Sequence, residues 1–113
     1  MPITGEYAVL QIQKFSDSGS IDLPIDTRFI SFLPDTIVLE GMKNSEYDVS
    51  AVVLNEIEGN EFYYINTLQK QLFLLVLNQQ DELKMNMPHF AKLTSEDGKE
   101  GIMYSLHRSV INT

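Results

Sequence analysis

Short segments in which apolar and polar residues alternate run along most of the chain, with turn residues between them. Because neighbouring side chains in a strand point to opposite faces, this alternation is typical of half-buried β-strands. In the first segment, Ala8, Leu10 and Ile12 are expected to share one apolar face. The stretch from Pro24 to Asp26 is expected to be irregular. Strands are predicted over residues 6–15, 28–33, 36–42, 47–57, 61–66, 90–93 and 102–111.

The segment 47–57 has the clearest alternation in the chain. Its odd positions are mostly apolar, whereas Asp48, Ser50 and Glu56 make the other face polar at both ends. A strand with this pattern buries its odd side chains together. The residues expected in the core are therefore Val49, Ala51, Val53 and Ile57.

Two groups of turn residues predict β-hairpins. Glu58-Gly59-Asn60 forms a very short link between two strand segments, and Gly and Asn both tolerate positive φ. The segment 96–101 contains two glycines among charged residues and joins the last two predicted strands. Hairpin connections of this kind favour antiparallel pairing.

The segment 67–86 fits two structures. As a helix, it would be capped by Thr67 and stopped by Pro88, with Leu68, Leu72, Leu75, Val76 and Leu83 on one face. As strand, residues 71–78 would be buried on both faces and a second strand would follow over 83–87. We favour the strand, because hairpin signals flank the segment.

These elements fit one domain spanning residues 1–113. The predicted fold is mainly β, an antiparallel sandwich or small barrel of short strands. The alternative is an α+β fold with one helix around 67–86 packed on a curved sheet.

Composition narrows the classes of partner. The chain has 16 acidic and 8 basic residues, a formal charge of −8, so it lacks the cationic surplus that neutralises phosphates. We therefore expect no direct nucleic-acid binding and no binding to anionic membranes, whereas a basic protein partner is admissible. The chain has no cysteine, its longest apolar run is Leu72–Leu77, and its first residues lack signal-peptide features. A cytoplasmic location is expected.

No pattern of reactive side chains predicts an enzyme. His89 and His107 are far apart and without ligand-spaced partners, so both are expected at the surface or rim. The oxygens of Asp17, Ser18 and Asp22 are close in sequence but lack an EF-hand's bidentate glutamate, which predicts a solvated turn. No nucleophile motif or phosphate-binding loop occurs. We expect no catalytic, cofactor-binding or metal-binding residues.

Two features remain as a candidate interaction surface. Acidic residues gather around the 58–60 turn, and both faces of the segment 62–65 are apolar. The chain is also rich in aromatic residues and methionine, including Phe73, Phe90 and Met103. The candidate surface consists of Phe62, Tyr63, Tyr64, Glu56, Glu58 and Glu61.

The favoured function is a non-enzymatic protein-interaction module, of the kind that serves phages and bacteria as adaptor, inhibitor or assembly component. The pattern leaves homo-oligomers open. The alternative is a β-barrel that holds a small apolar ligand inside. A third reading is an acidic decoy of a nucleic-acid-binding protein, because acids two residues apart on a strand, about 6.6 Å, match alternate phosphates, about 6.8 Å apart.

Overall fold

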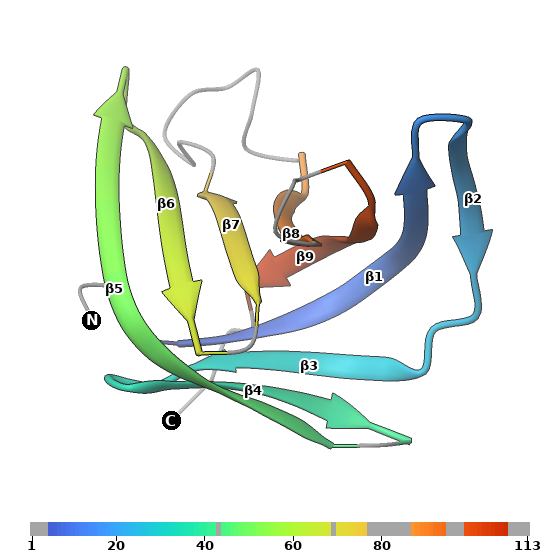
Figure 1. The fold of residues 1–113 in the computed structure, drawn as a ribbon, viewed down its shortest axis with the longest axis horizontal. Coiled ribbons are helices and arrows are strands. Elements are labelled where there is room, and N and C mark those ends of the chain that lie inside the picture. The colour runs from blue at the N-terminus through green and yellow to red at the C-terminus, as the bar shows by residue number, and fades with distance from the viewer. Residues whose placement is uncertain (1–4, 43, 69, 77–86, 95–98, 109–113) are drawn as a thin grey trace.

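The protein folds into a single antiparallel β-sheet that closes on itself (Figure 1). The structure is a computed structural model and describes residues 5–42, 44–68, 70–76, 87–94 and 99–108. Within these ranges every regular element is a strand. The strands are β1 (Gly5–Ser16), β2 (Gly19–Leu23), β3 (Thr27–Phe32), β4 (Thr36–Gly41), β5 (Ser45–Ile57), β6 (Asn60–Thr67), β7 (Gln71–Val76), β8 (His89–Thr94) and β9 (Gly101–Arg108).

Eight of the nine strands form the closed barrel, and β2 is an additional strand outside it. From β3 to β9 each strand pairs with the next one along the chain, and β1 closes the barrel by pairing with both β3 and β9. The distal half of β1 also pairs with β2. In Figure 1, β3 and β4 lie at the bottom of the view, the β5–β6 hairpin rises at the left and the β1–β2 hairpin at the right, with β7, β8 and β9 between them.

The mainly-β prediction is confirmed, and the barrel is the form that the fold takes. Residues 71–76 form strand β7, so the alternative helix over 67–86 is wrong there. The second predicted strand of that segment, 83–87, lies almost wholly outside the described residues. The stretch from Pro24 to Asp26 is irregular, as predicted, whereas strand β2, which pairs with β1 just before it, was not predicted. No helix in the described ranges is long and apolar enough to cross a membrane.

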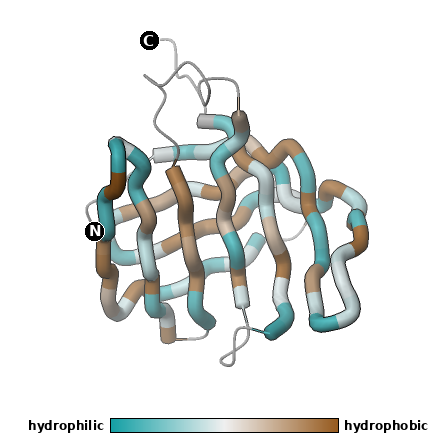
Figure 2. The backbone as a smooth tube through the Cα atoms, turned by 90° about the horizontal axis from the view of Figure 1, so that it is seen from above, coloured by the Kyte–Doolittle hydropathy of each residue, from teal (hydrophilic) through white to brown (hydrophobic). Residues whose placement is uncertain are grey.

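The interior of the barrel is filled by apolar side chains. Tyr7 and Phe32 meet edge to face inside it, with their ring centroids 5.6 Å apart. Residues from seven of the eight barrel strands are fully or almost fully buried around them, among them Ile12, Ile30, Ile37, Ile65, Leu72, Leu74 and Leu106. Close packing of branched side chains from facing strands is the usual source of stability in small barrels. After Gln71, apolar residues continue along β7 without alternation (Figure 2); its inward residues are buried and its outward residues are half-buried.

A β-bulge in β1 changes which of its residues face the interior. The pairing with β9 shifts between Val9 and Gln11, which leaves Leu10 as the extra residue. Tyr7 and Val9 point inward before the bulge, and Ile12 points inward after it. The prediction that Leu10 shares a buried face with Ile12 is therefore wrong, because one inserted residue reverses the alternation.

A second bulge, in β5, means that most of the core residues predicted in this strand are wrong. Its pairing with β6 shifts between Val49 and Ala51, and the extra residue Ser50 donates a hydrogen bond from Oγ to the Asn66 carbonyl oxygen at 3.0 Å. Val49 packs against the core before the bulge, and Val52 does so after it. The remaining predicted core residues of this strand, Ala51, Val53 and Ile57, are exposed, Val53 by 55%.

Candidate functional site

The outward faces of β6 to β9 form an apolar groove on the outside of the barrel. Strand alternation places Tyr63, Ile65, Leu72 and Leu74 inside, so the residues between them point outward. The groove has a volume of about 430 Å³ and is open to solvent on one side. Its lining residues are Phe62, Tyr64, Phe73, Leu75, Phe90, Lys92, Thr94 and Met103.

Register explains why these side chains meet. Tyr64 lies opposite Phe73 across β6 and β7, and Phe73 lies opposite Lys92 across β7 and β8. Lys92 in turn lies opposite Met103 on β9. One row of the groove therefore runs straight across four strands, and Val53 of β5 extends this row at the Tyr64 end.

Three aromatic rings form one wall of the groove. The ring centroids of Phe62 and Tyr64 are 4.7 Å apart, and those of Tyr64 and Phe73 are 5.4 Å apart at a nearly perpendicular angle. These are favourable geometries for aromatic pairs, so the three rings support one another's orientation. Tyr64 is nevertheless 41% exposed, which leaves part of its ring available for contact.

Besides the Tyr64 hydroxyl, the groove lining has two polar side chains, Lys92 and Thr94, both from β8. The Lys92 ammonium lies 4.4 Å from the centroid of the Phe15 ring, a cation–π contact. Thr94 is 2% exposed, and among the described residues its hydroxyl oxygen has no hydrogen-bond partner. Buried hydroxyl groups are normally paired, so this oxygen is an unusual feature of the groove wall.

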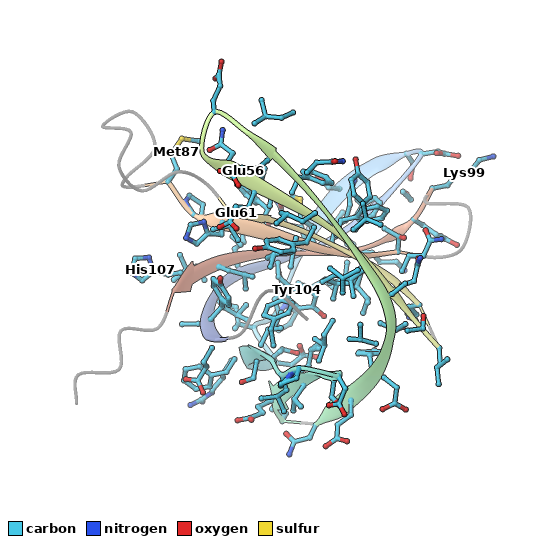
Figure 3. The ribbon with its side chains drawn as sticks, turned by 90° about the vertical axis from the view of Figure 1, so that its left-hand side faces the viewer. Glu56, Glu61, Met87, Lys99, Tyr104 and His107 are labelled. Carbon is cyan, nitrogen blue, oxygen red and sulfur yellow. The ribbon has the colours of Figure 1, made fainter. Side chains whose placement is uncertain are left out.

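A second polar group lies at one end of the barrel. Glu56 and Glu61 are directly opposite each other on β5 and β6, and Figure 3 shows them side by side. The Tyr63 hydroxyl donates a 2.6 Å hydrogen bond to Oε2 of Glu61. Burial first, and then the bond to the Glu61 carboxylate and its charge, raise the pKa of Tyr63 well above its ordinary value.

Tyr104 is almost fully buried toward the opposite end of the barrel. This end holds a small cavity of about 240 Å³, whose walls include Tyr104, Tyr47, Asp26 and Thr27. Burial is the main cause that raises the pKa of Tyr104 to about 12, with further contributions from Tyr47 and Asp26, whereas a hydrogen bond with Thr27 opposes the rise. Figure 3 places this ring in the interior of the molecule.

The structure divides the predicted interaction surface between two faces of the sheet. Phe62 and Tyr64 line the outer groove. Tyr63 is 3% exposed and points into the barrel, on the same side as Glu56 and Glu61. Glu58 lies in the turn beyond them. The aromatic and acidic halves of the predicted surface therefore do not form one continuous patch.

The two histidines have different environments. His107 is exposed, as predicted. His89 was expected at the surface or rim but is 3% exposed, because alternation along β8 places it inward with Ala91 and Leu93. Its ring packs edge-on against Tyr7, with the centroids 5.9 Å apart.

The turn between β1 and β2 gathers no set of metal ligands. Ser16 pairs with Gly19 across it, and the Oδ1 atom of Asp22 accepts hydrogen bonds from the side-chain amides of Gln11 and Gln13, each at 3.0 Å. In the parts of the chain that the structure describes, no three His, Asp or Glu side chains come together in a way that could hold a metal ion.

Sequence reasoning found part of the groove and missed the rest. The surplus of aromatic residues and methionine included Phe73, Phe90 and Met103, but no pattern joined them into one site. No motif in the sequence distinguishes Lys92 and Thr94, although they alternate with the apolar Ala91 and Leu93 in a way that places them on the outer face. The register of β7 against β6 and β8 is what brings these residues together in one groove.

Comparisons with known proteins give this chain no family. No protein-family model matches it, and a search of the curated proteins finds no relative.

Proposed function

We propose that the protein is a non-enzymatic protein-interaction module that binds its partner through the outer groove of β6 to β9. The observation that carries this proposal is an apolar, aromatic-walled groove of about 430 Å³ on the outside of a barrel whose interior is packed with side chains except for a smaller cavity of about 240 Å³ toward one end. Apolar surface of this kind marks contact sites in soluble proteins. Aromatic residues such as Tyr64 are also the side chains that dominate binding energy at interfaces.

The filled interior favours this function over a barrel that holds a small apolar ligand. The interior of the barrel is packed with large side chains such as Tyr7, Phe32 and Leu74, each almost completely buried. Small-molecule sites usually enclose most of the ligand surface, whereas the groove is open along one side. A second macromolecule covers such an open groove better than a small molecule does.

The acidic decoy receives little support from the positions of the acids. Glu56 and Glu61 are opposite each other on neighbouring strands, where side chains are about 5 Å apart. The Glu61 carboxylate also accepts a hydrogen bond from Tyr63 at the end of the barrel. These two acids are neighbours across strands, whereas the phosphate spacing calls for acids two residues apart along one strand.

The test is affinity capture from cells that naturally contain the protein, quantified by mass spectrometry for three baits. These baits are the wild type, Tyr64→Ala in the groove and Leu33→Ala, which removes a comparably exposed apolar side chain at the end of β3. A partner should be retained by the wild type and Leu33→Ala and be lost or reduced about tenfold with Tyr64→Ala.

Melting temperatures of the three baits serve as the folding control. Equal capture by all three folded baits would place the interface elsewhere. If capture also weakens steeply with salt, the −8 charge steers a basic partner toward the protein, as the composition predicts.

A further inference from the structure

The groove has a single positively charged side chain, and it is surrounded by apolar and uncharged neighbours. Phe73 and Met103 lie beside Lys92 on the neighbouring strands, and Phe90 lies two residues before it on the same face. Within the described residues, the Lys92 ammonium contacts the Phe15 ring, and no carboxylate pairs with it. In a chain with twice as many acids as bases, this cation is left available for a partner.

Thr94 adds a second polar atom on the same face. It follows Lys92 by two residues, so the two side chains leave β8 in the same direction about 6.6 Å apart. Its hydroxyl is buried and has no partner among the described residues, yet the residue lines the groove. An unpaired buried hydroxyl becomes more stable when a ligand oxygen supplies the missing hydrogen bond.

Together, an ammonium and a hydroxyl at the edge of an aromatic wall match a carboxylate attached to an apolar segment. A carboxylate has two oxygens, one for each of these groups, and charge-assisted hydrogen bonds are among the strongest. A phosphorylated segment fits less well, because phosphate recognition by proteins generally uses several arginines, and the groove lining has one lysine.

We propose that the groove recognises a partner segment that presents one Asp or Glu between apolar side chains, with the carboxylate at Lys92 and Thr94 and the apolar side chains on Phe62, Tyr64 and Phe73. This inference rests on the proposed function, since it specifies the partner of the same groove. It separates two electrostatic roles: the overall negative charge acts at long range, and the local cation selects an acidic residue at contact.

The experiment is a selection of random twelve-residue peptides displayed on phage against the immobilised full chain. Four variants are compared with the wild type: Lys92→Met, Thr94→Val, Tyr64→Ala and the control Lys14→Met, which removes an exposed lysine outside the groove. Enriched peptides should carry an Asp or Glu next to aromatic or branched residues. Their binding should survive Lys14→Met and be lost with Tyr64→Ala.

A double-mutant cycle on one enriched peptide then tests the contact itself. Changing its acid to the amide should weaken binding to the wild type about tenfold and should change binding to Lys92→Met much less. Thr94→Val should weaken the same peptide severalfold while leaving the melting temperature unchanged or higher, because an unpaired hydroxyl is replaced by a methyl group of similar size. A merely structural role for Thr94 would lower the melting temperature without this selective loss of affinity.

Several results would overturn the inference. Tyr64-dependent peptides without an acid, or an acid-to-amide effect that is equal on the wild type and Lys92→Met, would refute the acidic recognition and leave the proposed function standing. No Tyr64-dependent peptide at all would count against both. Lys92-dependent binding of decanoate without any enriched peptide would assign the groove to a small amphipathic acid instead. Self-association of the wild type that Tyr64→Ala abolishes, again without enriched peptides, would assign it to a second copy of the chain.

Discussion

Glu58 occupies the first position of the two-residue turn between β5 and β6. Its φ is 54° and that of Gly59 is 80°, and Ile57 pairs with Asn60 across them. Two successive positive φ angles are the signature of a type I′ turn, whose twist matches that of the flanking strands. Glycine adopts this conformation freely and asparagine does so readily, but glutamate does so at a cost. Gly59, the residue that best predicts this hairpin, therefore adopts its positive φ without strain, whereas Glu58 before it is strained.

Glu58→Asn should stabilise the protein by about 0.5–1 kcal/mol, because asparagine tolerates the left-handed conformation and prefers this turn position. Urea unfolding followed by circular dichroism measures the change. Glu46→Asn is the matched control: it removes the same charge from an exposed position in the extended part of β5. The strain argument fails if both substitutions shift the unfolding midpoint equally.

Tyr104 gives the folded protein a dependence on alkaline pH. Its pKa rises from 10.0 to about 12 in the folded state, so the folded protein holds the phenol proton more tightly than the unfolded chain does. This contribution to stability is complete below pH 10 and is lost as the pH rises from 10 toward 12. Stability should therefore decline steeply in that interval.

Tyr104→Phe should flatten the decline between pH 10 and 12, because phenylalanine has no proton to lose. At neutral pH the variant should be slightly less stable, since it gives up the hydrogen bond with Thr27. Unfolding midpoints measured at pH 8, 10, 11 and 12 test this. Parallel curves for the variant and the wild type would exclude Tyr104 as a source of the alkaline sensitivity.

At the scale of the strand, most elements follow from the alternation of apolar and polar residues, and the errors come from bulges. Each of the two longest strands, β1 and β5, contains one inserted residue, Leu10 and Ser50 respectively. Long strands that bend around a barrel commonly use bulges to do so. No residue type marks these bulges in the sequence, so strict alternation places Val53 inside, although it faces the solvent.

Two adjacent valines of β5 test the register that the bulge sets. Val52→Ala should destabilise the protein by about 1–2 kcal/mol, because Val52 packs against the core. Val53→Ala should change stability by less than about 0.5 kcal/mol, because its side chain is mostly in solvent. Thermal or urea unfolding of both variants decides the matter, and a reversed order of effects would mean that β5 lacks the bulge.

The groove was harder to predict than the strands, because its lining depends on how the strands pair. The apolarity of both faces of 62–65 indicated an outward-facing apolar surface, which Phe62 and Tyr64 provide. The remaining lining residues come from β7, β8 and β9, and only the order and register of these strands bring them together. Lys92 is part of the groove only because aromatic residues of other strands lie around it, so no local sequence pattern could identify it.

For the whole molecule, charge and exposed apolar surface oppose each other. Only the first residues of β5, Ser45–Asp48, pair with β4, so along its distal half β5 has β6 as its one partner among the described strands. Val53, Leu54 and Ile57 are exposed along this free edge, and the groove lies beside it. Free edges with apolar side chains promote association between chains, and a net charge of −8 counteracts it by repulsion.

The protein should therefore self-associate as the pH approaches its isoelectric point of about 4.5, where this repulsion vanishes. Light scattering between pH 7 and 4 should show a sharp increase near that value. Val53→Lys places a charge at the free edge and beside the groove. This variant should show a smaller increase in scattering, or none. Scattering that does not depend on this substitution would mean that the chains self-associate through another surface.

The closure of the barrel by β1 and β9 constrains the order in which the chain can fold. Strands β3 to β9 pair with their neighbours in sequence, so these hairpins can form soon after each is synthesised. In the long pairing between β1 and β9, residues 7–15 pair with residues 108–101, which lie more than eighty positions later in the sequence. During translation, the edge of β1 that pairs with β9 stays unsatisfied until β9 leaves the ribosome. The nascent chain is thus most vulnerable to misassembly before β9 has emerged, and a pause in translation after β8 would prolong that exposure.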